Sequence, residues 1–410
     1  MSKTSRKRKA GEAVASVPFA PGFKPPGAAK VKRALGRLTK PDSAYEDDGE
    51  TPFFQSIPKP TSEDDWLAQY NETGQTYDQF LEQSPWLASR RLTNMKQTFN
   101  KSGQNLAEKY PDGKIYLLPL GSFGDEIPSE QFDKLVEYTQ AFFGSVPVVQ
   151  LPGVALDVDK SAVYWNGEVR TEPEHESDNR HGEPAEAAAA PPPAKRCKPS
   201  GRAAKGHRHP LSARFHKTQE GTTRVQLRVD GVLDRLRRSI PDDALCLVAL
   251  TMMDLFHSKP DLFVAGYAGF LHRVGVFSFH RYQPGLKFSS EFWHELWQEE
   301  DSSTACECRS QEVLLQRSCR LLVHEICHLF CIDHCIFHAC CMNGSGHLQE
   351  DFSQPMYLCP VDLRKLQVLC GFNIVDRYKK LAEFFQRNNL TNESQWYKRR
   401  IEFIETAGKE

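Results

Sequence analysis

Residues 324 to 334 read His-Glu-Ile-Cys-His-Leu-Phe-Cys-Ile-Asp-His, and their types and spacing predict a catalytic zinc site. Residues four apart lie on one face of a helix, so His324 and His328 can present two imidazole nitrogens to one ion. Glu325 lies beside them, where its carboxylate can act as general base on a zinc-activated water. His334 lies six residues beyond His328, so the chain must turn sharply to bring it round as third ligand. The pattern therefore predicts a metallopeptidase.

Other interpretations of this segment remain open at this point. The histidines could instead be buried polar residues of a helix, satisfied by hydrogen bonds. His338 and His347 are rival third ligands by composition, but neither has the spacing of His334.

A group of cysteines surrounds the histidines. Ten of the twelve cysteines lie between Cys306 and Cys370. In a reducing compartment such a cluster favours metal binding over disulfides.

The motifs together carry a family resemblance. The string from His324 to Cys335, followed by Cys340 and Met342 and later by Cys359-Pro360, resembles the archaemetzincins, zinc metallopeptidases of the metzincin group. Supporting similarity extends to residues 250–255, 274–279 and 363–366, and the resemblance covers roughly residues 110–156 and 220–385.

The resemblance implies a fold and two zinc ions. The implied fold is α/β (α+β) and metzincin-like, a twisted mixed sheet with an active-site helix and a small C-terminal zinc-bearing subdomain. One zinc is catalytic, held here by the three histidines. The other is structural, in a site normally built from four cysteines, which correspond here to Cys335, Cys340, Cys359 and Asp362. Met342 takes the place of the Met-turn residue.

Two departures from the family pattern bear on these sites. Cys331 stands where metzincins have Gly, at a backbone position that favours φ > 0, and this costs on the order of 1 kcal/mol. Asp362 stands where the family has its fourth cysteine. A carboxylate oxygen can bind zinc at about 2.0 to 2.2 Å, so this site is chemically possible, although it is less soft than a site of four thiolates. Cys341 and Cys370 are spare thiols that could substitute.

Apolar periodicity and turn residues predict the elements that position these side chains. The predicted strands are 114–120, 146–151, 245–250, 262–267 and 273–279, and the predicted helices are 129–143, 223–239 and one from about residue 311 into the zinc motif.

Changes in composition divide the chain into five parts. We predict a disordered basic tail (1–62), a helical N-terminal extension (63–110), an upper subdomain (111–156 and 218–331), a disordered insertion (157–217), and a lower C-terminal subdomain with the structural zinc site (332–410).

Charge and hydropathy limit location and partners. No apolar run is long enough to span a membrane, and the N-terminus lacks a secretory pattern, so we expect an intracellular protein in the cytoplasm, the nucleus or both. The basic cluster 6–9 fits an import receptor, or else is simply a solvated tail. Nucleic-acid binding is not expected, because the basic half of the insertion lacks interleaved aromatic residues.

The predicted function is peptide-bond hydrolysis on a peptide or protein substrate, with endopeptidase and aminopeptidase activity both open. In metzincins the substrate lies along the edge strand of the sheet, here near residues 262–269. The alternative is a zinc-stabilised nuclear interaction protein with weak or no activity. Glu325 argues against it, because a purely structural zinc site needs no general base.

Overall fold

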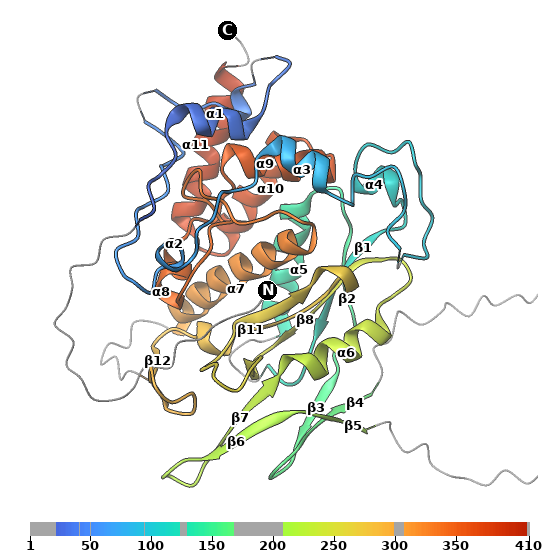
Figure 1. The fold of residues 1–410 in the computed structure, drawn as a ribbon, viewed down its shortest axis with the longest axis vertical. Coiled ribbons are helices and arrows are strands. Elements are labelled where there is room, and N and C mark those ends of the chain that lie inside the picture. Colours follow the sequence, from blue (N-terminus) through green and yellow to red (C-terminus); the bar gives the residue numbers. More distant parts are fainter. Residues whose placement is uncertain are drawn as a thin grey trace, which may run out of the picture.

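The computed structural model describes most of the chain (Figure 1). The described residues are 22–40, 42–49, 51–93, 95–123, 129–167, 208–298 and 307–407. The basic cluster 6–9 and the greater part of the predicted insertion lie outside them. Within these ranges no helix combines the length and apolar character needed to cross a membrane.

The centre of the molecule is a five-stranded sheet in the order β10-β11-β8-β1-β2. Its strands are β1 (Lys114–Pro119), β2 (Val148–Gln150), β8 (Ala244–Thr251), β10 (Gly266–Gly269) and β11 (Val274–Ser278). All pairs are parallel except β10 with β11, so the edge strand β10 runs antiparallel. All eight residues of β8 are buried, as expected for a continuous apolar strand covered on both faces.

Helices cover both faces of this sheet. The helices concerned are α5 (Ser129–Phe143), α6 (Val229–Ser239) and α7 (Glu307–Leu329). Ile115 and Leu117 of β1 belong to the core formed with α5 and α7, whereas Tyr116 and Leu118 belong to the core formed with α6. This alternation follows from the two-residue period of a strand. The predicted mixed α/β architecture is therefore confirmed.

In the described part of the chain four helices follow the zinc motif (Figure 1). They are α8 (Leu348–Ser353), α9 (Pro360–Cys370), α10 (Ile374–Arg387) and α11 (Thr391–Ala407). α10 packs on α5, where Arg377 Nε donates to the Phe142 carbonyl at 2.7 Å. α11 packs on α10, and α9 packs against the N-terminal helices. The C-terminal helices thus share one core with the main sheet.

Three smaller sheets complete the described part of the fold, and two of them contribute buried side chains to the core on the α6 face of the main sheet. They comprise β3 (Ala155–Val158), β4 (Val163–Asn166) and β5 (Arg208–Leu211); β6 (Ala213–Lys217), β7 (Thr223–Arg228) and β9 (Asp254–Phe256); and the hairpin of β12 (Leu286–Phe288) and β13 (Leu296–Gln298). Both described ends of the predicted 157–217 insertion therefore contain strands. The helix predicted over 223–239 is wrong in its first third, because Thr223–Arg228 pairs with β6 and β9 before α6 begins.

The N-terminal region contains short helices connected by extended chain. They are α1 (Ala28–Leu35), α2 (Trp66–Gln69), α3 (Tyr77–Gln83) and α4 (Leu106–Lys109). The structure differs from the predicted tail over the described part of residues 22–62. There α1 contacts α3 and α9, with Ala34 fully buried and Val31 and Leu35 packed against the core. These apolar side chains give the basic segment a face to bury.

Candidate metal centres

Three histidines converge at the C-terminal end of α7. His324 and His328 lie one helical turn apart, and their Nε2 atoms are 3.0 Å from each other. One nitrogen from each of these residues and from His334 lies within 4.8 Å of the other two. All three side chains are half-buried. The structure therefore brings together the three residues predicted from the spacing.

The sharp turn that delivers His334 is built around Cys331. Cys331 has φ +65°, as expected from its place in the motif. Its amide donates to the His328 carbonyl at 3.0 Å, and the Ile332 amide donates to the Cys327 carbonyl at 3.0 Å. These two bonds close α7 with the double cap that usually carries glycine in the left-handed position.

The outward nitrogens of the two helical histidines are held by backbone carbonyls. His324 Nδ1 lies 2.8 Å from the Cys341 carbonyl, and His328 Nδ1 lies 2.7 Å from the Ile332 carbonyl. Because a carbonyl can only accept, each Nδ1 carries the proton and each Nε2 keeps a free lone pair. Both imidazoles are thus fixed in the tautomer that binds a metal through Nε2.

The outward nitrogen of His334 is held by a side chain from the N-terminal region. His334 Nδ1 lies 2.9 Å from Glu72 Oε1, which also accepts a hydrogen bond from Trp66 Nε1 at 2.8 Å. Burial raises the pKa of Glu72, but the hydrogen bonds from His334 and Trp66 outweigh it, and the net pKa is lowered. Sequence reasoning missed Glu72, since no motif connects it to residues 324–334.

Protonation also suits these residues to their predicted roles. Burial, with the neighbouring imidazoles, lowers the pKa of His324 well below its ordinary value, and burial lowers that of His328 to about 3. Both are therefore neutral at neutral pH, which is the form that binds metal. Burial raises the pKa of the half-buried Glu325 to about 7, and His334 opposes this rise. A carboxylate with such a pKa is well matched to general-base chemistry near neutral pH.

A cavity opens beside this centre. It has a volume of about 630 Å³, and its lining includes Trp66, Glu72, His328 and His334. Side chains of the N-terminal region thus form part of the approach to the histidines.

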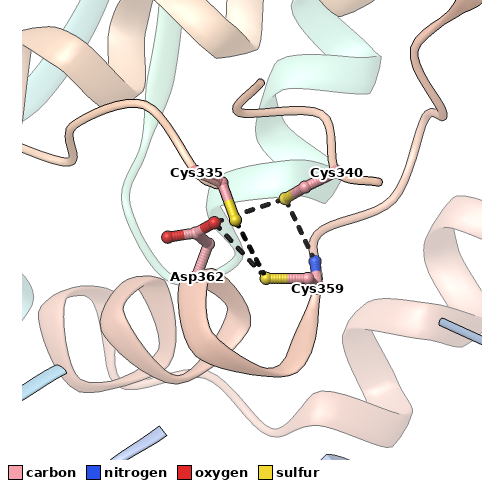
Figure 2. Close-up of side chains that lie close together, drawn as sticks. All are labelled: Cys335, Cys340, Cys359 and Asp362. Atoms are coloured by element: carbon pink, nitrogen blue, oxygen red, sulfur yellow. Dashed lines mark hydrogen bonds between the residues drawn. The ribbon is translucent and has the colours of Figure 1, made fainter. Parts of the chain in front are cut away.

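A second cluster is formed by three cysteines and an aspartate (Figure 2). Cys335 Sγ lies 3.6 Å from Cys359 Sγ, and Asp362 Oδ2 lies 3.3 Å from Cys340 Sγ and 3.4 Å from Cys359 Sγ. All four side chains are buried, and their ligand atoms lie within 4.8 Å of one another. Cys335 and Cys340 come from the segment after α7, whereas Cys359 and Asp362 lie at the start of α9. The cluster therefore joins two parts of the chain.

The surroundings of this cluster fit a bound cation. Backbone amides donate to sulfur at Cys335 (3.4 Å) and at Cys340 (3.2 Å). Burial raises the pKa of the Cys340 and Cys359 thiols, and burial together with Cys335 raises the pKa of Asp362 to about 7. Lys365 Nζ donates to Asp362 Oδ1 at 2.8 Å. A cation among the sulfur atoms would favour the charged form of every one of these acids.

The other thiols named from the sequence lie elsewhere. Cys341 and Cys370 are buried and belong to neither cluster, so neither replaces Asp362 in the described geometry. Met342 is fully buried in the main core, and its carbonyl accepts a hydrogen bond from the Cys335 amide at 2.7 Å. Cys306 lies outside the described residues.

The rival histidines have different surroundings. His338 packs against Phe54, with ring centroids 6.1 Å apart. His347 forms a third set of possible metal ligands with Asp65 and Glu350. Both of its ring nitrogens are already engaged, since Nε2 lies 2.9 Å from Asp65 Oδ1 and Nδ1 accepts from the Glu350 amide at 3.2 Å. Its contacts hold the N-terminal region against α8.

Fold and site together define a class, proteins with a His-Glu-x-x-His helix packed on a mixed sheet and a third histidine beyond a tight turn. Comparison with known proteins is more specific. The sequence is 38% identical to archaemetzincin-2 of Rattus norvegicus over 316 residues, which cover 74% of this chain and 72% of that protein. The chain belongs to the archaemetzincin family.

Further matches have different coverage. Archaemetzincin-2 of Macaca fascicularis is 38% identical over 177 residues, which cover 41% of this chain and 49% of that protein, so this match spans about half of the relative. The crystal structure of an archaemetzincin from Methanopyrus kandleri matches at 18% identity with a TM-score of 0.34, over 62% of this chain and 94% of that one. No family model matches the sequence.

Proposed function

We propose that this chain is a zinc metallopeptidase that hydrolyses peptide bonds. The observation that carries the proposal is the convergence of His324, His328 and His334, each with its Nδ1 held from outside, beside a carboxylate one residue along the helix. Membership of the archaemetzincin family supports the same reaction.

In this proposal the three histidines hold the catalytic zinc through Nε2. When bound, the zinc lowers the pKa of a water molecule and polarises the substrate carbonyl. Glu325 takes the proton from the attacking water and delivers it to the leaving amine. Burial raises the pKa of its carboxyl group above the ordinary value, which suits a group that first accepts and then donates a proton.

We also propose that the second cluster holds a structural zinc. Its ligands are Cys335, Cys340, Cys359 and Asp362, which connect the segment after α7 to α9. Metal binding at such a site adds to the free energy of folding, because the ligands are not brought together in the unfolded chain. In the same scheme residues 332–410 form the lower subdomain, and Met342 serves as the Met-turn residue.

The substrate is a peptide or protein segment in extended form. The strand β10 lies at the edge of the main sheet, with one side paired to β11, and its Tyr267 is exposed. A peptide can add to such an edge through backbone hydrogen bonds. Peptide libraries with free or blocked N-termini separate aminopeptidase from endopeptidase activity.

The experiment that tests the proposal is turnover of a peptide library by the full chain. We expect cleavage that a chelator abolishes and zinc restores, together with two equivalents of zinc in the active protein. Zinc binding without turnover of any peptide would contradict the proposal and favour the zinc-stabilised interaction protein. Zinc absent from the histidines would contradict both.

A further inference from the structure

We infer that Glu72 is a positioning residue for the third zinc ligand, and that the segment 64–75 is a built part of the zinc site. The inference rests on the proposed function, because it concerns how His334 is presented to the catalytic zinc. It adds a residue that lies 262 positions before His334 in the chain.

His334 depends on an external partner more than the other two histidines do. His324 and His328 are oriented by α7 itself and by carbonyls that follow it closely in sequence. His334 lies beyond the end of the helix, and its Nδ1 meets a carboxylate rather than a carbonyl. A carboxylate on the outer nitrogen fixes the ring and raises its basicity as a ligand, an effect worth roughly 10- to 100-fold in metal affinity.

Glu72 is itself held in position. Trp66 donates from Nε1 to the oxygen that binds His334, and its ring packs edge-on against the His334 ring with centroids 4.9 Å apart. Trp66 also packs against Tyr70, with ring centroids 4.0 Å apart. The side chains of Glu72 and His334 are only 22% and 20% exposed. The contact is therefore a packed one rather than a chance surface pair.

Glycines on both sides of the contact make room for this segment. A Cβ at Gly344 would overlap the Trp66 indole, and a Cβ at Gly346 would overlap the Asp64 carbonyl. In the segment itself, Gly74 has φ +72°, and a Cβ there would lie 2.6 Å from Ile336. Backbone closeness of this kind requires glycine. This close fit indicates that the segment 64–75 is packed tightly beside His334.

The test compares Glu72→Ala and Glu72→Gln with the wild-type full chain, and uses Glu82→Gln as control. Glu82 is an exposed carboxylate on the neighbouring α3. Each protein is loaded with cobalt(II), whose weak visible bands report histidine coordination and whose thiolate charge-transfer band reports the cysteine cluster. The rate of metal loss from each site to a chelator is then measured, together with the thermal stability of the protein after metal removal.

We expect Glu72→Ala to hold metal at the histidines roughly 10- to 100-fold more weakly, with the thiolate band unchanged. Glu72→Gln should weaken metal binding at the histidines less than Glu72→Ala does, since its amide oxygen still accepts from His334 Nδ1. Glu82→Gln should bind metal as strongly as wild type. Lower thermal stability of Glu72→Ala with unchanged metal loss from the histidines would overturn the inference, because it shows a merely structural role. Wild-type protein with metal on its thiolates alone would instead contradict the proposed function.

Discussion

Lys365 Nζ donates to Asp362 Oδ1 at 2.8 Å, and neither side chain is exposed to solvent. The other carboxylate oxygen of Asp362 faces the sulfur atoms of Cys340 and Cys359. The aspartate therefore stands between a buried cation and a group of thiols. Lys365 thus balances charge on one oxygen of Asp362, and the other oxygen faces the thiols, where it is available to a metal.

Removing Lys365 should therefore destabilise the protein strongly. Lys365→Met keeps an unbranched side chain but leaves Asp362 buried without its partner, and loss of one member of a buried pair costs about 3–5 kcal/mol. Urea unfolding at pH 7 measures the change. Lys379→Met is the matched control, because Lys379 pairs with Glu405 on the surface and should give no measurable change. Equal stability of the two variants would refute a role for the buried pair.

Replacing Asp362 with a fourth thiolate should tighten metal binding at the second cluster. In Asp362→Cys, the cluster has four sulfur ligands instead of three sulfurs and one oxygen. We expect zinc affinity at this site to rise at least about tenfold, or 1.4 kcal/mol. Competition with a chromogenic chelator measures it. Cys370→Ala is the control, since Cys370 is buried outside the cluster. An affinity change in Cys370→Ala but none in Asp362→Cys would mean that the ligand set is misassigned.

Zinc uptake at the cysteine cluster should release protons. Burial raises the pKa of Cys340 and Cys359 above the ordinary value, so both thiols are protonated at neutral pH and each must lose a proton to bind metal. Apparent affinity should therefore fall as pH falls below these pKa values. Calorimetry in two buffers of different ionisation enthalpy counts the protons.

The histidine centre provides the contrast. Because the pKa values of His324 and His328 are lowered, these ligands are already neutral at pH 7 and release no proton. In Cys359→Ala, zinc binding to the histidines should show little dependence on buffer. Identical proton release in wild type and Cys359→Ala would be incompatible with this account.

The turn at Cys331 carries strain that glycine can relieve. With φ +65°, Cys331 occupies a left-handed conformation that is unfavourable for a residue with a Cβ. Cys331→Gly should stabilise the protein by up to about 1 kcal/mol without changing its zinc content, and Cys331→Val should destabilise it. Thermal unfolding of wild type, Cys331→Gly and Cys331→Val gives their order of stability. A glycine variant less stable than wild type would show that the packing of the Cys331 side chain outweighs the backbone strain.

Local sequence patterns predict the framework well where length and composition favour one element. The apolar run at 245–250 is short, which favours a buried strand over a buried helix, and β8 is confirmed there. The helix prediction is wrong at Thr223–Arg228 because two patterns fit its apolar residues. They match a helical stripe that Val232 and Leu233 continue, and they also match a two-residue alternation. Pairing with β6 and β9 decides between them, and that information is not local.

The same limit separates the predicted part of the site from the rest. His324, His328 and His334 are close in sequence, so helical spacing and one turn suffice to bring them together. Glu72 meets His334 only through the tertiary fold, and nothing near Glu72 indicates its partner. Lys365 was within reach of sequence reasoning, because a basic residue one helical turn after Asp362 can pair with it.

The most direct test of the central claim is peptide hydrolysis by Glu325→Gln, measured together with its zinc content. Glu325 is the proposed base and lies outside the metal-ligand group, so its amide variant should retain the zinc of wild type. Loss of a general base lowers turnover by roughly 10²- to 10⁴-fold. If Glu325 is the general base, turnover falls by this factor at unchanged zinc stoichiometry. Wild-type turnover by Glu325→Gln would contradict this role.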